Sequence, residues 1–176
     1  ELATRHYKSG NYKKLEKILP EMDMVMINDV FRKGVEFAIR KTPTPPETYV
    51  EISKKFIDQM IAKVGDGSYA QTMVASPRQA EGLARLWLNY YICVHAQVAE
   101  KCGRYQEAVD VMNLIDEDQR YISYPAGNEA YIVSLEKLGN HTEAFEAMKG
   151  AASAGQMTPV IYDKLREHYA TLKEKP

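Results

Sequence analysis

Hydrophobic residues recur every three or four positions along most of this chain, which is the spacing that places them on one face of an α-helix. The pattern is clearest over residues 45–65, 77–102 and 159–172. Its apolar positions are Val50, Phe56, Ile57, Met60, Ile61 and Val64, then Leu83, Leu86, Trp87, Tyr90, Tyr91, Val94 and Val98, and finally Ile161, Leu165, Tyr169 and Leu172. Alternating Val, Ile and Thr runs joined by hairpin turns are absent from the sequence. The pattern predicts an all-α protein.

Start and stop residues frame these three helices. Thr44-Pro45-Pro46-Glu47 and Ser76-Pro77-Arg78-Gln79 each combine an N-cap hydroxyl, a proline and a side chain that can close a capping box. Thr158-Pro159 opens the last helix in a similar way. Gly65 and Cys102-Gly103 predict helix ends, because glycine adopts the left-handed cap at little cost.

One ten-residue pattern occurs twice, 36 residues apart. Residues 103–112 (GRYQEAVDVM) align with residues 139–148 (GNHTEAFEAM), with Gly, Glu, Ala and Met in the same places. Weaker copies begin at Gly10 and Gly67. The Gly ends one helix, the small Ala lets the next helix approach it, and the Met fills the groove to the following hairpin. Each hairpin leaves an apolar face uncovered, so the pattern predicts a right-handed α-solenoid of stacked antiparallel helical hairpins.

The Pro-rich segment 41–46 suggests where this solenoid begins. We expect an N-terminal helical pair over residues 1–41 and a helical-repeat domain over residues 42–176 that is continuous with it. The sequence contains no run of about 18 apolar residues, so it predicts no transmembrane helix and no membrane insertion.

Positive and negative charges nearly cancel over the whole chain, but they are distributed unevenly along the sequence. The 23 Lys and Arg residues against 24 Asp and Glu residues argue against a strongly basic nucleic-acid binder. Residues 100–147, which contain the two clear repeats, are acidic and would repel phosphate. The N-terminus is basic. Its candidates for contact with an RNA backbone are Arg5, Lys8, Lys13, Lys14 and Lys17, and a solvated helix face is the alternative interpretation.

The cysteines and histidines, which commonly act in catalysis or metal binding, are scattered along the sequence. Cys93 and Cys102 form no CxxC pair, and both are expected as small hydrophobic residues. The four histidines, His6, His95, His141 and His168, have no HExxH or i,i+4 partner, so we expect no metal site, no cofactor and no enzyme activity. His95 lies in the long apolar helix and is predicted to be a core histidine.

Three short segments have both a functional and a structural interpretation. Gly65-Asp66-Gly67-Ser68 looks like a phosphate loop but lacks the Lys-Ser/Thr that should follow, so an ordinary loop is predicted. Asp116-Glu117-Asp118 has carboxylates for a cation, and an exposed turn between helices is the favoured interpretation. The Met-rich segment 22–26 suits an adaptable partner surface or, more commonly, buried helix packing.

The C-terminal half also carries a family resemblance. From Gly139 the chain runs through Glu143-Ala144 to Gly155, and then through residues 158–165 (TPVIYDKL). Over residues 88–175 this order resembles the pentatricopeptide repeat family. The tetratricopeptide repeat is a close rival, because it shares the Gly-x-Tyr-x-Glu-Ala core seen from Gly103 to Ala108 and has a repeat of about 34 residues.

The pentatricopeptide resemblance implies a non-catalytic scaffold or adaptor in an organellar ribonucleoprotein, such as a mitochondrial ribosome or an RNA-processing complex. It implies protein subunits and RNA as partners, no small-molecule substrate, and a mitochondrial location, with the cytoplasm as the alternative. RNA-reading members use a few side chains per repeat. The matching positions are Cys93, Glu129, Thr158 and Asp163, and the first two depart from the Asn, Thr or Ser that such members favour. The tetratricopeptide alternative implies an adaptor that binds a peptide or a helix in its groove.

Overall fold

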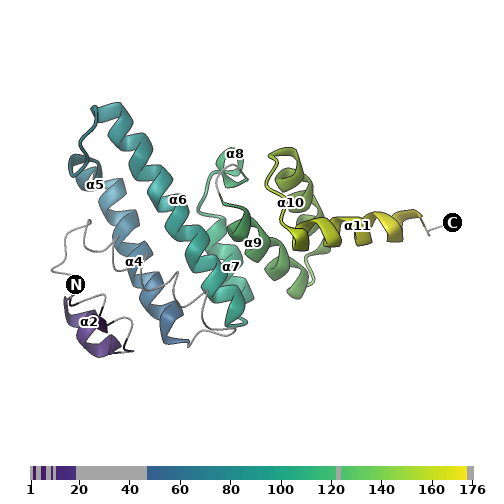
Figure 1. The fold of residues 1–176 in the computed structure, drawn as a ribbon, viewed down its shortest axis with the longest axis horizontal. Helices are drawn as coiled ribbons and strands as arrows, with labels where there is room; N and C mark the ends of the chain where they lie inside the picture. Colours follow the sequence, from purple (N-terminus) through teal and green to yellow (C-terminus); the bar gives the residue numbers. More distant parts are fainter. Residues whose placement is uncertain are drawn as a thin grey trace. The chain divides into compact units, whose positions relative to one another are not determined.

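The computed structural model describes residues 2, 5, 6, 9, 11–18, 47–121 and 124–173. Every regular element in these ranges is a helix, which confirms the all-α prediction for them (Figure 1). The chain divides into two compact units, residues 1–91 and 92–176, and the division lies inside one long helix. The boundary expected at residues 41–42 and the Met-rich segment 22–26 lie outside the described residues and stay predictions. Among the described helices, none has the length and apolarity needed to span a membrane.

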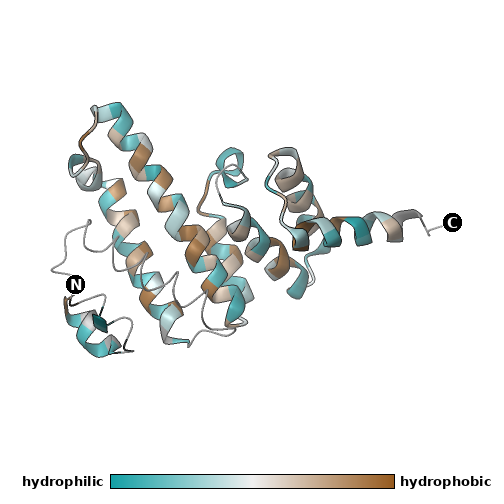
Figure 2. Ribbon diagram, in the orientation of Figure 1, coloured by the Kyte–Doolittle hydropathy of each residue, from teal (hydrophilic) through white to brown (hydrophobic). Residues whose placement is uncertain are grey.

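The first unit contains α2 (Tyr12–Ile18), α4 (Thr48–Gly65), α5 (Ser68–Gln71) and the N-terminal part of α6 (Pro77–Lys101). Figure 2 shows hydrophobic and hydrophilic residues alternating around α4 and α6. The hydrophobic face of α4 contributes to the core of the unit. The buried hydrophobic residues of α4 are Val50, Ile52, Phe56, Ile57 and Met60. Burial of each such side chain stabilises the fold by about 1.5–3 kcal/mol, so this stripe is what holds α4 in place.

The predicted signals act at the start of α6 and at the end of α4, but Glu47 forms no side-chain cap hydrogen bond and α4 begins at Thr48. The side-chain carbonyl Oε1 of Gln79 accepts hydrogen bonds from the backbone N–H of Ser76 at 3.3 Å and from its hydroxyl at 2.7 Å. This is the Gln half of a capping box at the start of α6. α4 ends at Gly65 as predicted, and the loop that follows is held by Asp66, whose Oδ1 accepts from the Ser68 N–H at 2.8 Å.

The second unit contains the rest of α6, then α7 (Tyr105–Met112), α8 (Glu117–Arg120), α9 (Pro125–Lys137), α10 (His141–Ser153) and α11 (Pro159–Lys173). α9 packs against both α7 and α10, and α11 packs against α10 and α9. The predicted start of the last helix is confirmed, because the hydroxyl of Thr158 accepts a hydrogen bond from the Ile161 N–H at 3.2 Å.

The two segments that align in sequence have the same local structure. Gly103 and Gly139 both have positive φ, +74° and +81°, which is a conformation that costs little only for glycine. At the first, the next N–H, of Arg104, donates to the Ala99 carbonyl at 2.9 Å. At the second, the Asn140 N–H donates to the Leu135 carbonyl, also at 2.9 Å. Both ends are therefore Schellman caps. The residues that follow at matching places are buried in both copies: Ala108 and Ala144, and Met112 and Met148.

Candidate functional site

A polar contact between consecutive helices occurs twice in the second unit, at positions 36 residues apart. His95 on α6 faces Glu107 on α7, with 3.2 Å between Nε2 and Oε1. Tyr131 on α9 donates its hydroxyl hydrogen to Oε1 of Glu143 on α10 at 2.9 Å. Both glutamates are the shared Glu of the aligned segments. Each hairpin is thus joined by the same helix-to-helix contact, although its partner changes from an imidazole to a phenol.

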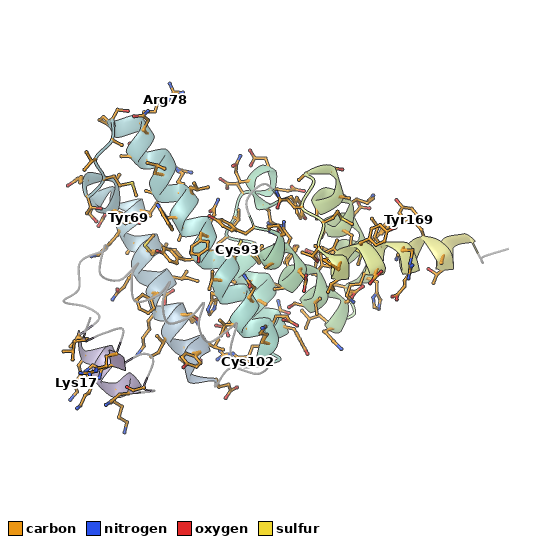
Figure 3. All side chains as sticks on the ribbon, viewed as in Figure 1. Lys17, Tyr69, Arg78, Cys93, Cys102 and Tyr169 are labelled. Atoms are coloured by element: carbon orange, nitrogen blue, oxygen red, sulfur yellow. The ribbon has the colours of Figure 1, made fainter. Side chains whose placement is uncertain are left out.

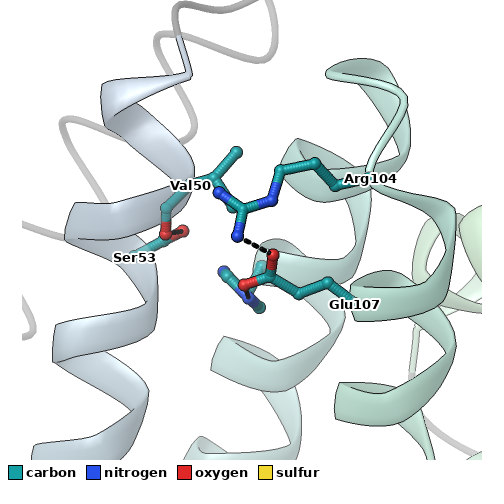
Figure 4. Close-up of polar contacts among 5 residues, drawn as sticks. Val50, Ser53, Arg104 and Glu107 are labelled. Carbon is teal, nitrogen blue, oxygen red and sulfur yellow. Dashed lines mark hydrogen bonds and ion pairs between the residues drawn. The ribbon is translucent and has the colours of Figure 1, made fainter.

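The contact at His95 is buried and linked to a cation. The side chain of His95 is 1% exposed, so the prediction of a core histidine is confirmed. Glu107 also pairs with Arg104, whose guanidinium nitrogen lies 2.5 Å from Oε2 (Figure 4). The Glu107 carboxylate thus links His95 of α6 to Arg104 at the start of α7.

The contact at Tyr131 is the centre of a larger network. Arg120 donates to the tyrosine hydroxyl at 3.2 Å and lies over its ring, 5.2 Å from the centroid. Oδ1 of Asn113 lies 3.1 Å from the same hydroxyl. Burial, and then the hydrogen bond to the Glu143 carboxylate, raise the pKa of Tyr131 well above its ordinary value. The hydroxyl therefore stays protonated and serves as a fixed donor between α9 and α10.

The four predicted repeat-face positions lie in different surroundings. Cys93 is 2% exposed, burial raises the pKa of its thiol to about 12, and its side chain meets the backbone of α9 at Gly127. A role in ligand contact therefore does not fit Cys93, which packs the core instead. Glu129 is half-buried on α9, and Thr158 is half-buried and caps α11. Asp163 is exposed on α11.

Two of the acidic residues on α6 and α9 interact. Burial raises the pKa of the Glu100 carboxyl above its ordinary value, and the neighbouring Glu129 carboxylate raises it as well, while Lys101 and Lys137 lower it. Glu100 and Glu129 are therefore like charges close to each other, with Lys101 and Lys137 also close to Glu100. We call Glu100 and Glu129 the acidic pair. The two carboxylates themselves repel phosphate, and they suit a basic or neutral partner.

We expect Glu100→Gln to increase stability at pH 7 by less than about 1 kcal/mol, because the side chain is only half-buried. A carboxyl whose pKa is raised by folding opposes folding once pH rises above its unfolded value, and glutamine removes that effect. The gain should shrink as the pH falls toward 4. Urea unfolding at pH 7 and pH 4 measures it, with the exposed Glu81→Gln as control. A variant no more stable than the parent at pH 7 would contradict the assignment.

The basic N-terminal residues are described in part. Lys13, Lys14 and Lys17 lie exposed on α2, where Figure 3 labels Lys17, and Arg5 is exposed before it. Lys8 lies outside the described residues. The spacing of the three lysines places their positive charges within about one turn of helix. Three neighbouring positive charges are enough for contact with a polyanion. The same arrangement is also common on a helix face that contacts only water.

A metal site in the described part of the chain would need several ligand side chains close to one another. No three His, Cys, Asp or Glu side chains gather there closely enough to hold a metal ion. Asp116-Glu117-Asp118 forms the start of α8, a single exposed turn between α7 and α9, as predicted. Gly65-Asp66-Gly67-Ser68 covers the last residue of α4, the two-residue loop and the first residue of α5.

One surface was not singled out from the sequence. A shallow depression on α11 is lined by Tyr162, Leu165, Arg166, Tyr169 and Ala170. Tyr162 is 58% exposed and Tyr169, labelled in Figure 3, is 47% exposed. Lining residues 162, 165, 166 and 169 are three or four positions apart or adjacent, which places them on one face of α11, but the same spacing is normal for a buried helix face.

No family model, curated protein or solved structure matches this chain.

Proposed function

We propose that this chain is a non-catalytic helical-repeat adaptor that holds protein subunits of an organellar ribonucleoprotein, such as a mitochondrial ribosome or an RNA-processing complex. In this proposal its hairpins stack as a right-handed α-solenoid of the pentatricopeptide type, and its location is mitochondrial. Catalysis has no part in it.

The observation that carries the proposal is the recurrence of one hairpin design in the second unit. The His95–Glu107 and Tyr131–Glu143 contacts, the glycine caps before them and the buried alanines after them all recur at an interval of 36 residues. Repeated hairpins that each contact only their neighbours present long surfaces, and such surfaces serve binding. The buried His95 and Tyr131 join consecutive helices through these contacts, which supports a structural role for both residues.

Charge favours protein over RNA as the main partner. The acidic pair Glu100 and Glu129 lies on consecutive first helices of the hairpins, where pentatricopeptide proteins place their base-reading side chains. Negative charge there weakens contact with phosphate. Cys93 is buried and cannot read a base. Protein subunits with basic or neutral surfaces fit this face better.

The proposal is tested by purifying the tagged chain from cells in its native complex. We expect a fixed set of protein subunits that remains bound after ribonuclease treatment. Reversal of the acidic pair, Glu100→Lys with Glu129→Lys, should release at least one subunit. The matched control reverses the exposed Glu47 and Glu81 in the first unit and should leave the set intact. A chain that purifies alone would contradict the adaptor function.

RNA contact is a separate prediction for α2. If the helix contacts phosphate, the triple variant Lys13→Glu, Lys14→Glu and Lys17→Glu should weaken binding to a single-stranded RNA about 10-fold or more at 50 mM salt. The parent should lose affinity steeply as salt rises. Fluorescence anisotropy measures both, and the charge-matched control is Lys54→Glu with Arg78→Glu and Arg85→Glu, all exposed in the parent. Equal affinity of the triple variant and the control would assign α2 to a solvated face.

The tetratricopeptide alternative keeps one specific observation in its favour. α9 begins at Pro125 and α11 at Pro159, so these two helices start 34 residues apart. That interval is the length of a tetratricopeptide repeat. A structure of the chain with an extended peptide or a helix bound in its groove would favour this alternative over subunit scaffolding.

A further inference from the structure

The chain enters α6 through a segment whose side chains are almost all exposed. From Gln71 to Gln79 only Met73 is half-buried, and Val74 is fully exposed. Ser76 lies in this segment and directly precedes Pro77, the first residue of α6. A proline restricts the residue before it to extended conformations. Ser76 therefore presents its hydroxyl on an exposed stretch of chain that ends at the start of a helix.

The first turns of α6 have little tertiary packing that would hold them closed. Among residues 77–83 only Ala80 is buried, and Figure 3 shows the labelled Arg78 pointing away from the helix. Gly82 weakens the helix, because glycine in a helix interior is less stable than alanine. A Cβ at Gly82 would meet nothing within 4 Å, so close packing does not require the glycine. Helix ends with little burial open locally before the rest of a fold does.

The hydroxyl of Ser76 is held by an exposed contact. It donates to Oε1 of Gln79 at 2.7 Å, and both side chains are exposed. The backbone of Ser76 takes part in the helix, because its carbonyl accepts from the Ala80 N–H at 2.8 Å. Water can replace the partner of an exposed hydrogen bond, so an enzyme that pulls this turn open meets little resistance.

A second hydroxyl of the described chain precedes a proline, and it is held more firmly. Thr158 precedes Pro159 at the start of α11, and its side chain is half-buried. Its hydroxyl oxygen accepts from the N–H of Ile161, whose side chain is fully buried. Opening the first turn of α11 would expose that isoleucine to water. The same kind of dipeptide is therefore accessible at Ser76 and protected at Thr158.

We propose that Ser76 is a phosphorylation site for a proline-directed serine/threonine kinase. Such kinases modify a serine or threonine that is followed by proline, and they need the chain around it accessible and extended. In the reaction Ser76 Oγ bonds to the γ-phosphorus of ATP, the bond from that phosphorus to ADP breaks, and the hydroxyl proton is released.

The phosphate would change the start of α6. It carries about two negative charges and places acceptor oxygens at the N-terminus of the helix, where the helix dipole favours them. The guanidinium of Arg78 lies two residues further along the chain and is exposed. The amide of Gln79 can turn its NH₂ group toward the phosphate, which replaces the contact that the hydroxyl makes now. The modified helix therefore begins with a more firmly closed first turn.

The test treats the full chain with a proline-directed kinase and ATP and maps the phosphate by mass spectrometry. We expect phosphate on Ser76 and none on Thr158. Pro77→Ala, which keeps the hydroxyl, should slow modification of Ser76 at least several-fold. The matched control is Thr72→Ala, which removes an exposed hydroxyl that no proline follows and should leave the phosphate on Ser76 unchanged. The chain purified from cells with phosphatase inhibitors should also carry phosphate on Ser76.

Hydrogen exchange measures the effect of the phosphate on α6. Amides of residues 78–82 should exchange about 2- to 5-fold more slowly after modification, while those in the first turn of α11 should not change. Circular dichroism checks that each variant is folded. A folded chain without phosphate on Ser76, after kinase treatment or from cells, would overturn the proposal. Equal or faster exchange would overturn the closing of the first turn. Neither outcome bears on the adaptor function, which does not depend on this modification.

Discussion

Gly127→Ala should lower the free energy of unfolding of the second unit by about 1–3 kcal/mol. A Cβ at this position would lie 2.5 Å from the Cβ of Cys93 and 3.1 Å from its Cα, so α9 would have to move away from α6. The backbone of α6 cannot rotate aside as a long side chain can. Urea unfolding followed by circular dichroism measures the loss, and the midpoint of thermal unfolding should fall by about 2–4 °C for each kcal/mol.

A matched control for this variant is Gly82→Ala on α6. A Cβ at Gly82 meets nothing within 4 Å, so this variant should gain about 0.5–1 kcal/mol from the better helix propensity of alanine. The opposite signs of the two changes separate close packing from propensity. If Gly127→Ala were as stable as the parent, α6 and α9 could not approach as closely as the structure places them. The variant Cys93→Gly should recover part of the stability of Gly127→Ala, because it removes the opposing Cβ.

Tyr131→Phe should cost about 1 kcal/mol, because it removes the hydroxyl of a buried ring whose partners Glu143 and Asn113 are themselves exposed to water. Glu143 loses a donor at 2.9 Å and Arg120 loses an acceptor at 3.2 Å, and neither gains a replacement from phenylalanine. The ring itself is kept, so packing changes little. Urea unfolding at neutral pH measures the loss. The pKa of Tyr131 is raised so far that the hydroxyl stays protonated under these conditions.

The control for Tyr131→Phe is Tyr162→Phe, which removes an exposed hydroxyl and should change stability by less than about 0.5 kcal/mol. Glu143→Gln should cost less than Tyr131→Phe, since its amide oxygen can still accept the hydrogen bond. Equal stabilities of Tyr131→Phe and the parent would show that the hairpin of α9 and α10 is held by apolar packing alone.

Much of the local structure could be predicted because its causes are local. Ser76 and Thr158 mark helix starts through contacts three residues away, at Gln79 and Ile161. Gly103 and Gly139 end helices through bonds that span five residues. The pattern around these glycines also predicted which alanines and methionines are buried. Such signals need no knowledge of the rest of the chain.

Other features depend on partners far along the chain. Cys93 matched a ligand-contact position, but its burial results from the approach of α9 at a glycine 34 residues later. The shared Glu of the two segments was noted as a pattern, yet nothing local indicates that its partner lies 12 residues earlier on the preceding helix. Tyr162 and Tyr169 have the spacing of a core face, and only the arrangement of helices leaves them exposed.

The sequence by itself determined that the described part of this chain is helical, where α6 and α11 begin and where α4 and α6 end, and that one hairpin pattern recurs 36 residues apart. Helix periodicity, N-caps and left-handed glycines act over a few residues, so the sequence suffices for them. The tertiary structure decided which faces of those helices are covered. It buried Cys93, joined Tyr131 to Glu143, and left Tyr162 exposed on α11. Burial is set by what packs against a face, and an amphipathic pattern is the same whether its partner lies in this chain or in another.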